Sequence, residues 1–175
     1  VVVVSAMGKT TNELENVLGV LNKEGVVSAQ AQMNSIIDSH EAIARELGVN
    51  VDLRLIFESA LKSANELEDE DARYDALVAA GEDASTRVLS GYLKTKNGEA
   101  MWSDARDVIL TDTKHRSARV NERKIYENGA GLRTSLSEMA NRIIVTQGFI
   151  GRCPTGRTTT LGREGSDYSA ALLAC

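Results

Sequence analysis

The sequence is poor in cysteine, histidine and proline. Its two cysteines, Cys153 and Cys175, do not make a disulfide framework, so we expect reduced thiols and a cytoplasmic protein. Its two histidines, His40 and His115, argue against a zinc site built from His and Cys ligands. No apolar run approaches the roughly 20 residues of a membrane-spanning helix, so no membrane partner is expected.

What the sequence does contain is typical of one soluble globular domain. Its 175 residues are 42% hydrophobic and 26% charged, which allows a sizeable buried core without a disulfide or a structural metal. The formal net charge of -5 argues against a nucleic-acid-binding surface. We interpret the basic stretch at residues 114–124 as a solvated loop and helix start. Nucleic acid is therefore not expected as a partner.

Both ends of the sequence look interrupted. The chain opens with Val1 to Val4, which indicate a strand buried on both faces, as in parallel sheets. We do not expect this segment to be a signal peptide, which would need a basic start and a longer apolar stretch. The chain closes with the apolar helical segment 170–175, which has no glycine, asparagine or basic residue to end it. We expect the chain to be part of a longer protein.

Hydrophobic spacing predicts helices that alternate with strands. The first three predicted helices run from Thr10 to Gly25, from there to Gly48, and over residues 51–67. The next two run through residues 74–92, ending near Asn97, and through residues 125–139. A last helix is predicted to start with Ser166 as its N-cap. Extended segments are expected at residues 1–4, 107–110, 142–151 and 158–161, with a hairpin turn at 153–156. Thr10 and Glu13 form a capping-box pattern. The alternation predicts an α/β layered fold with a mainly parallel sheet.

The junction between the first strand and the first helix, residues 5–12, is one candidate site. Backbone N–H groups and the positive end of a helix dipole favour anions at such a junction. Gly8, Lys9 and Thr10 look like the end of a P-loop, but that pattern needs a glycine five positions before Gly8, where Val3 stands. The P-loop interpretation is rejected, and an ordinary capped turn remains the alternative.

An acidic residue on an inward-facing helix stripe is a second candidate. Helical spacing places Glu82 in line with Val78, Ser85 and Leu89. A carboxylate in that position is costly unless it has a partner or binds a polar ligand. The alternative is a structural glutamate bonded to nearby backbone or to a lysine.

Residues 156–168 carry the strongest candidate site. This segment combines threonine hydroxyls on an extended strand, glycines that allow close backbone approach, an arginine in a turn and a Ser-Asp pair that opens a helix. Arg163 can fork onto a carboxylate or a phosphate. The helix dipole favours anions at Ser166, and Asp167 can accept backbone N–H bonds or hold a lysine. The combination predicts an anion-binding turn.

Five blocks of the sequence also carry a family resemblance. They are residues 1–6 followed by Thr11-Asn12, Gly81-Glu82 with Ser85, residues 148–151, residues 158–163, and residues 165–171. In this order they resemble the aspartokinases of the amino-acid kinase family, over the whole chain and most specifically after Thr158. The resemblance implies an incomplete amino-acid kinase fold, a three-layer α/β/α sandwich with a mainly parallel sheet.

The resemblance implies a phosphoryl transfer from ATP, with Mg²⁺, to the side-chain carboxylate of L-aspartate. The product would be 4-phospho-L-aspartate, at the first step toward lysine, threonine and methionine. By motif, the substrate-binding residues would be Ser5, Thr11, Glu82, Phe149, Arg163, Glu164, Gly165 and Ser166. Arg163 would bind the α-carboxylate of aspartate and Glu82 its α-ammonium group. Asp167 would be the catalytic residue and would organise lysines around the transferring phosphoryl group.

The sequence departs from the family pattern in what it omits. The family has an N-terminal Lys-Phe-Gly-Gly strand, later segments that bind the nucleotide, and C-terminal regulatory ACT domains. None of these lies in residues 1–175, so we expect a partial kinase domain that is inactive alone and belongs to a homo-oligomeric enzyme. Glu164 stands where glycine is commoner. Two alternatives stay open: a non-catalytic binding or assembly module, and a kinase of another small carboxylate or of a nucleoside monophosphate.

Overall fold

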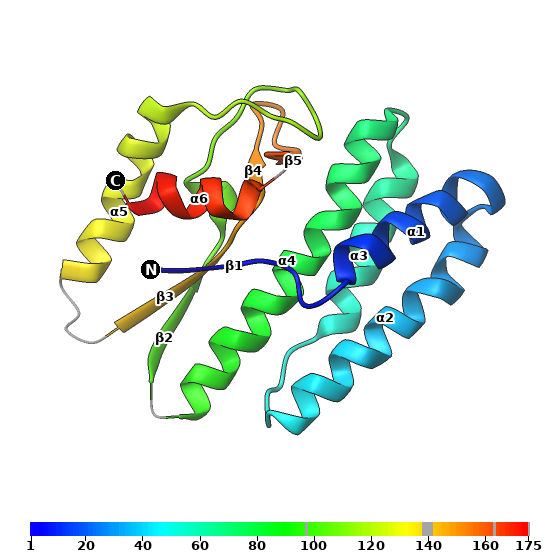
Figure 1. The fold of residues 1–175 in the computed structure, drawn as a ribbon, viewed down its shortest axis with the longest axis horizontal. Coiled ribbons are helices and arrows are strands. Elements are labelled where there is room, and N and C mark those ends of the chain that lie inside the picture. Colours follow the sequence, from blue (N-terminus) through cyan, green and yellow to red (C-terminus); the bar gives the residue numbers. More distant parts are fainter. Residues whose placement is uncertain (97, 138–141, 163, 175) are drawn as a thin grey trace.

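The computed structural model describes residues 1–96, 98–137, 142–162 and 164–174. Asn97, Met139, Arg163 and Cys175, all named above, fall outside these ranges. A bundle of long helices lies beside a smaller part that contains the strands and the last two helices (Figure 1). Within the described residues, no helix combines the length and apolar character that a membrane crossing requires.

Four helices form the bundle: α1 (Thr10–Glu24), α2 (Val26–Glu46), α3 (Leu53–Glu66) and α4 (Glu70–Thr95). They follow the predicted segments because their apolar side chains recur at helical spacing and are buried together. Met33, Phe57 and Leu77 are among the fully buried side chains of this core. Gly25, with φ 88°, separates α1 from α2, so the chain reverses where the sequence predicts a helix end.

The helix α1 begins at the predicted residue but without the predicted capping box. Its N-cap is Lys9, which makes no side-chain cap hydrogen bond. The hydroxyl of Thr10 instead donates to the Met7 carbonyl oxygen at 2.7 Å, and the side chain is buried beside His40 of α2. Asp69 is a true cap, since its carboxylate accepts from Ala72 N at the start of α4.

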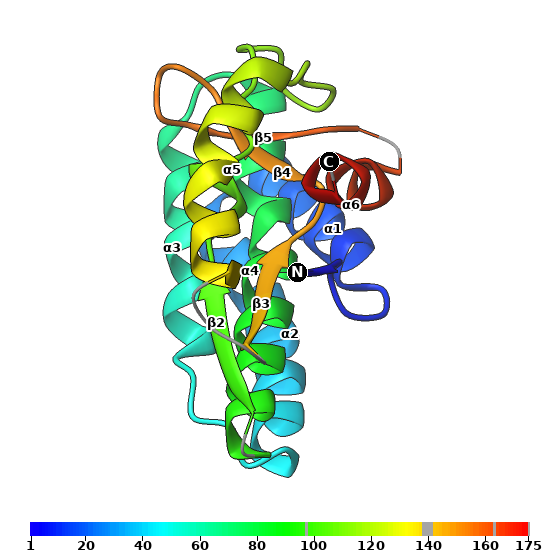
Figure 2. The ribbon, with the colours of Figure 1, turned by 90° about the vertical axis from the view of Figure 1, so that its left-hand side faces the viewer.

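The sheet is parallel and has the order β1-β3-β2, with β1 at Val2–Val4, β2 at Glu99–Ser103 and β3 at Arg142–Gln147. The helix α4 covers one side of the sheet. On the other side lie α5 (Glu122–Ser137) and α6 (Gly165–Ala174), as Figures 1 and 2 show. This arrangement confirms the predicted α/β fold with a mainly parallel sheet flanked by helices.

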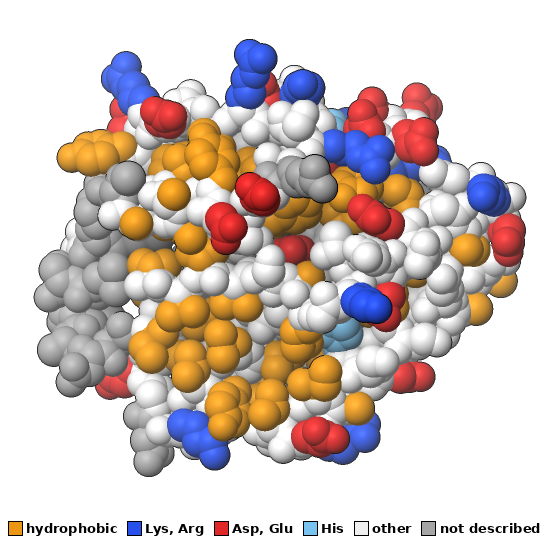
Figure 3. Space-filling model, viewed as in Figure 1, with side chains coloured by type: hydrophobic (Ala, Val, Ile, Leu, Met, Phe, Trp, Pro, Cys, Tyr) orange, Lys and Arg blue, Asp and Glu red, His pale blue; other side chains and the backbone are white. Residues whose placement is uncertain are grey.

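Two strand predictions are wrong. Residues 107–110 do not form a strand; a 3₁₀ turn at Ala105–Asp107 and a single bridge from Leu110 to Arg152 occupy that region. The strand that pairs with β3 on the edge opposite β1 is β2, which lies earlier in the chain than residues 107–110. The first strand is not buried on both faces either: Val2 is 39% exposed, and Val3 and Val4 are only partly buried. Within the described residues, β1 lies at the edge of the sheet. Hydrophobic side chains gather over the strands on the face seen in Figure 3.

The predicted hairpin is present, and the long strand predicted before it is broken in two. The strands β4 (Ile150–Arg152) and β5 (Thr158–Thr160) pair antiparallel around the turn at 153–156. Between β3 and β4, Phe149 adopts φ 68°, which ends the extended run. A Cβ on Gly148 would lie 2.8 Å from Ser166 Cβ, so glycine is needed where α6 approaches the end of β3.

One buried carboxylate, Asp75, fastens α4 to the strand-containing part. It is fully buried, and it accepts hydrogen bonds from His115 Nδ1 at 2.7 Å, Arg116 N at 3.1 Å and Thr160 Oγ1 at 2.6 Å. Burial raises the pKa of this carboxyl, and the hydrogen bonds oppose the rise. Asp75 thereby holds both the loop after β2 and the strand β5 against α4.

Removing this carboxylate should cost far more stability than removing its neighbour on the same helix. We expect Asp75→Ala to lower the free energy of unfolding by about 3–5 kcal/mol, because it leaves buried donors without an acceptor. Asp71→Ala, which removes an exposed ion pair to Arg116, should cost at most about 0.5 kcal/mol. Urea unfolding of both variants measures the difference, and equal losses would contradict the role given to Asp75.

Candidate functional site

A cavity of about 490 Å³ opens beyond the carboxyl ends of β1 and β3, beside α4 and the start of α6. Its described lining residues are Ser5, Thr11, Tyr74, Glu82, Arg116, Phe149, Gly162, Glu164, Gly165, Ser166 and Asp167. In open α/β sheets, ligands bind outside the carboxyl ends of parallel strands. In Figure 3 the centre of the face is hollowed, and both acidic and basic side chains surround the hollow.

Site residues predicted from the sequence lie together in this cavity, although they come from four separate segments of the chain. Ser5, Thr11, Glu82, Phe149, Glu164, Gly165, Ser166 and Asp167 all line it. Arg163 lies outside the described residues. Two lining residues were missed: Tyr74, which reads as an ordinary member of a helix stripe, and Arg116, which lies in a basic stretch interpreted as solvated. For Arg116, no sequence signal separates it from the neighbouring basic residues.

The loop after β1 forms one wall of the cavity. Its position is fixed because Gly148 N donates to Val4 O at 2.9 Å and Ser85 Oγ donates to Ser5 O at 2.7 Å. The hydroxyl oxygens of Ser5 and Ser166 lie 2.5 Å apart and share a hydrogen bond. The strand end and the start of α6 therefore face each other across a short distance.

Glu82 is the buried acidic group of the site. It is 2% exposed, and its Oε1 accepts from Ala6 N at 3.2 Å. Its Oε2 is buried and has no hydrogen-bond partner among the described residues. Burial raises the pKa of this carboxyl to about 8. A Cβ on Gly81 would lie 2.8 Å from Ala6 Cβ, so a glycine here lets α4 approach the loop that covers Glu82. An unpaired carboxylate oxygen at a cavity wall suits a ligand that donates hydrogen bonds.

The start of α6 forms the opposite wall. The helix begins at Gly165, one residue before the predicted cap, and Ser169 Oγ accepts from Phe149 N at 2.9 Å. Ser166 and Asp167 lie in the first turn, where backbone N–H groups have no partner within the helix. This end of the helix favours an anion. Asp167 is exposed at the cavity, and among the described lining residues there is no lysine for it to organise.

Backbone strain is concentrated at this cavity. Within the described residues, three side-chain-bearing residues have positive φ: Arg116 at 60°, Phe149 at 68° and Glu164 at 59°. All three line the cavity. Each such residue costs about 1 kcal/mol or more, and strain of this kind persists at functional sites because the surrounding structure enforces it. The strain therefore marks the same place as the buried carboxylate and the helix start.

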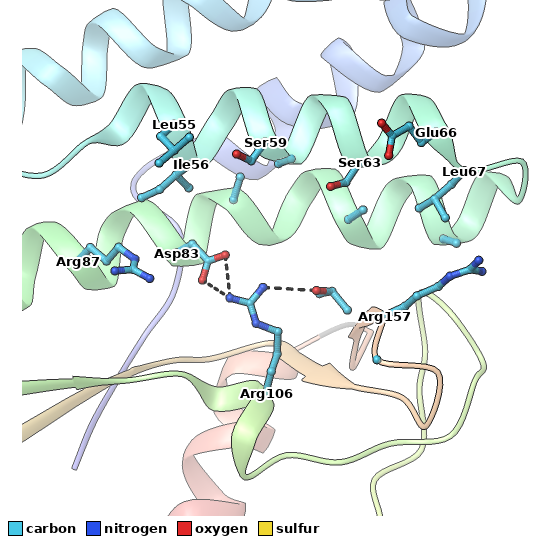
Figure 4. A pocket seen from close by; sticks show the side chains of 16 residues that line it. Leu55, Ile56, Ser59, Ser63, Glu66, Leu67, Asp83, Arg87, Arg106 and Arg157 are labelled. Atoms are coloured by element: carbon cyan, nitrogen blue, oxygen red, sulfur yellow. Dashed lines mark hydrogen bonds and ion pairs between the residues drawn. The ribbon is translucent and has the colours of Figure 1, made fainter.

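A second cavity, of about 550 Å³, lies between α3, α4 and the turn of the hairpin (Figure 4). Its central guanidinium, Arg106, is already paired: it donates to Asp83 at 2.8 Å, to Asp104 at 2.8 Å and to Thr158 at 3.3 Å. These bonds join α4 to the segment after β2 and to β5. The charged centre of this cavity thus has a structural role, unlike the unpaired oxygen of Glu82.

A parallel sheet flanked by helices, with a polar cavity at its carboxyl edge, defines an α/β ligand-binding domain. The chain belongs to the amino acid kinase family, whose model matches residues 1–175. It is 34% identical over 174 residues to the aspartokinase of Chlamydia trachomatis, covering 98% of this chain and 38% of that protein. The structure of Escherichia coli aspartokinase III in complex with aspartate and ADP matches with TM-score 0.82 at 32% identity, covering 98% of this chain and 39% of that one.

The same Escherichia coli enzyme in complex with lysine and aspartate matches with TM-score 0.81. The chain therefore spans about two fifths of the length of these relatives, since it covers 38% of one and 39% of the other. The similarity identifies the chain as an aspartokinase homologue that corresponds to part of the kinase domain.

The strain at Glu164 gives a test of the site's geometry. Glu164→Gly should be more stable than Glu164→Ala by about 1 kcal/mol, because glycine adopts φ 59° freely and alanine does not. Both variants lose the same carboxylate, so the difference isolates the backbone. Thermal unfolding of the pair measures it. If alanine proved as stable as glycine, Glu164 would not be held in the left-handed region.

Proposed function

We propose that this chain is the central part of an aspartate kinase catalytic domain. The whole enzyme would transfer the γ-phosphoryl group of ATP to the side-chain carboxylate of L-aspartate and give 4-phospho-L-aspartate. The observation that carries the proposal is the unpaired, buried oxygen of Glu82 in the same cavity as the start of α6. The similarity to aspartokinases, one of them in complex with aspartate and ADP, supports it.

The cavity has the charge pattern that a free amino acid requires. In the proposal, Glu82 accepts hydrogen bonds from the α-ammonium group, which supplies the partner that its Oε2 lacks. The α-carboxylate lies at the amino end of α6, where Ser166 and the backbone N–H groups donate. By the family motif, Arg163 would bind the same carboxylate. Binding both ends of the amino acid orients the side-chain carboxylate for reaction.

In the reaction, a carboxylate oxygen of aspartate forms a bond to the γ-phosphorus of ATP, and ADP leaves. Such a transfer depends on positioning and charge neutralisation, and it needs no covalent nucleophile from the protein. Ser5, Thr11, Phe149, Glu164 and Gly165 complete the wall around the acceptor. Asp167, which is exposed at the cavity, would organise cationic groups around the phosphoryl group.

When bound, ATP would supply the phosphoryl group, and Mg²⁺ would balance its negative charge. In the part of the chain that the structure describes, no three metal-ligating side chains gather. The proposal therefore assigns neither the metal nor the adenine to particular residues of this chain. It places the enzyme in the cytoplasm as a homo-oligomer that contributes to lysine and threonine synthesis.

Aspartate-dependent ATP turnover by the full-length protein tests the proposed function directly. A coupled assay should show ADP release only with aspartate, and Arg163→Ala should raise KM for aspartate by about tenfold or more, because a charge-assisted contact is lost. Turnover with glutamate or acetylglutamate but not with aspartate would show that the substrate is another small carboxylate. No turnover with any of these acids would leave a binding module and refute the kinase proposal.

The pKa of about 8 at Glu82 predicts a pH-dependent affinity. An ammonium group binds the ionised carboxylate, so aspartate affinity should fall by about tenfold for each pH unit below 8. Glu82→Gln should weaken binding and abolish this dependence. Glu58→Gln, which changes an exposed carboxylate on α3, should leave the dependence intact. Calorimetric titrations between pH 6 and 9 measure both, and an unchanged profile in Glu82→Gln would contradict the assignment.

The same group affects stability with a definite sign. The pKa of Glu82 is raised by folding, so its contribution to stability is fully present below the ordinary value of 4.5 and is lost as the pH rises through about 8. Relative to the wild type, Glu82→Gln should therefore gain stability between pH 5 and pH 9. Thermal unfolding over that range measures the trend, and a constant difference would show that Glu82 titrates normally.

A further inference from the structure

We propose that Arg116 is a substrate-binding residue, whose guanidinium binds a carboxylate of the amino-acid substrate at the exposed edge of the cavity. This inference rests on the proposed function and adds to it a contact that neither the sequence motifs nor the family resemblance assigns. Four observations about Arg116 carry it: the charge of the cavity, the anchoring of its loop, the stacking of its side chain and the strain of its backbone.

The charge balance of the cavity calls for a cation. Among the described lining residues, Glu82, Glu164 and Asp167 are acidic, and Arg116 is the single basic one. A substrate with two carboxylates adds further negative charge. The amino end of α6 supplies only a partial positive charge. Arg163 is proposed above for the α-carboxylate, so the second carboxylate of the substrate still needs a countercharge. Arg116 provides that charge from the same cavity wall.

The loop that carries Arg116 is anchored on both sides. Arg116 N donates to the buried carboxylate of Asp75 at 3.1 Å, and Ala118 N donates to Thr160 O at 2.9 Å. A Cβ on Gly162 would lie 3.3 Å from Arg116 O, so this loop packs directly on the turn that leads into α6. The backbone of Arg116 is therefore held at a fixed place next to the proposed carboxylate site.

The guanidinium of Arg116 is oriented by its neighbours but can still bind a ligand. Its carbon lies 4.0 Å from the ring centroid of Tyr74, another lining residue, and its Nη1 lies 3.2 Å from Asp71. The Asp71 pair is half-exposed, with side chains 48% and 57% accessible, and such pairs contribute little free energy. Stacking on Tyr74 uses the face of the guanidinium and leaves its edge donors available. A substrate carboxylate can replace Asp71 while the stack remains.

The backbone of Arg116 adds the last observation. Its φ of 60° suits glycine, and any residue with a Cβ is strained there. A turn whose only task was to reverse the chain would be more stable with glycine. The strained arginine is therefore accounted for by what its side chain does in the cavity.

Three substitutions at this position separate binding from folding. Arg116→Gly and Arg116→Ala both remove the guanidinium, but glycine relieves the backbone strain and alanine keeps it. In the full-length protein we expect both to raise KM for aspartate by about tenfold, with KM for ATP changed by less than about twofold. Melting temperatures should diverge, with glycine equal to or above the wild type and alanine below it. Arg116→Lys should restore part of the aspartate affinity.

The outcomes distinguish the hypotheses. If KM for aspartate rises in Arg116→Ala but not in Arg116→Gly, the effect follows the backbone, and the inference is overturned in favour of a structural role. If neither variant changes KM while the wild type turns over aspartate, the inference fails and the proposed function stands. If the wild type shows no aspartate-dependent turnover, the proposed function fails first and this inference with it. Calorimetric titration with aspartate, without ATP, repeats the comparison independently of catalysis.

Discussion

Three carboxylates on α4, of which Asp75 and Glu82 are buried and Asp83 is partly buried, hold the helical bundle and the sheet together. Asp75 accepts hydrogen bonds from the loop after β2 and from β5, and Glu82 accepts one from the loop after β1. Asp83 accepts from Arg106 at 2.8 Å and from Gln147 at 2.7 Å. Burial raises the pKa of all three, so each depends on the donors that reach it. Asp75 and Asp83 are fully supplied within the protein. Glu82, which lines the ligand cavity, has one oxygen without a donor among the described residues.

The cavity combines features that oppose stability. It contains a carboxylate with a buried, unpaired oxygen and the residues with strained backbone, Arg116, Phe149 and Glu164. The same site is rigidly framed by short hydrogen bonds such as Ser5 to Ser166 and Ser85 to Ser5. Stability lost in the cavity is offset by the bundle core, which buries side chains such as Phe57 and Leu77 completely. Preorganisation of this kind suits a site that works by positioning and charge.

Much of the fold could be predicted because it follows local hydrophobic spacing. The four bundle helices and the hairpin lie where the periodicity and turn residues indicate. The strand β2 was missed because Glu99–Ser103 shows neither alternation nor a β-branched run, and its pairing with β3 comes from a partner more than forty residues later (Glu99 with Arg142). The candidate site residues came from motifs, whereas Asp75 and Arg116 did not, since their roles depend on segments that meet only in three dimensions.

The hydrogen bond between Ser5 and Ser166 joins residues separated by 161 positions, and β1 pairs with β3 over a similar span. Closing so long a loop is entropically expensive, whereas the bundle of α1 to α4 forms from neighbours in the chain. The ligand cavity is thus among the most non-local parts of the molecule. Helical content can be nearly complete in a population of molecules that has no competent site, so spectroscopic helicity is a poor gauge of how much protein is able to bind.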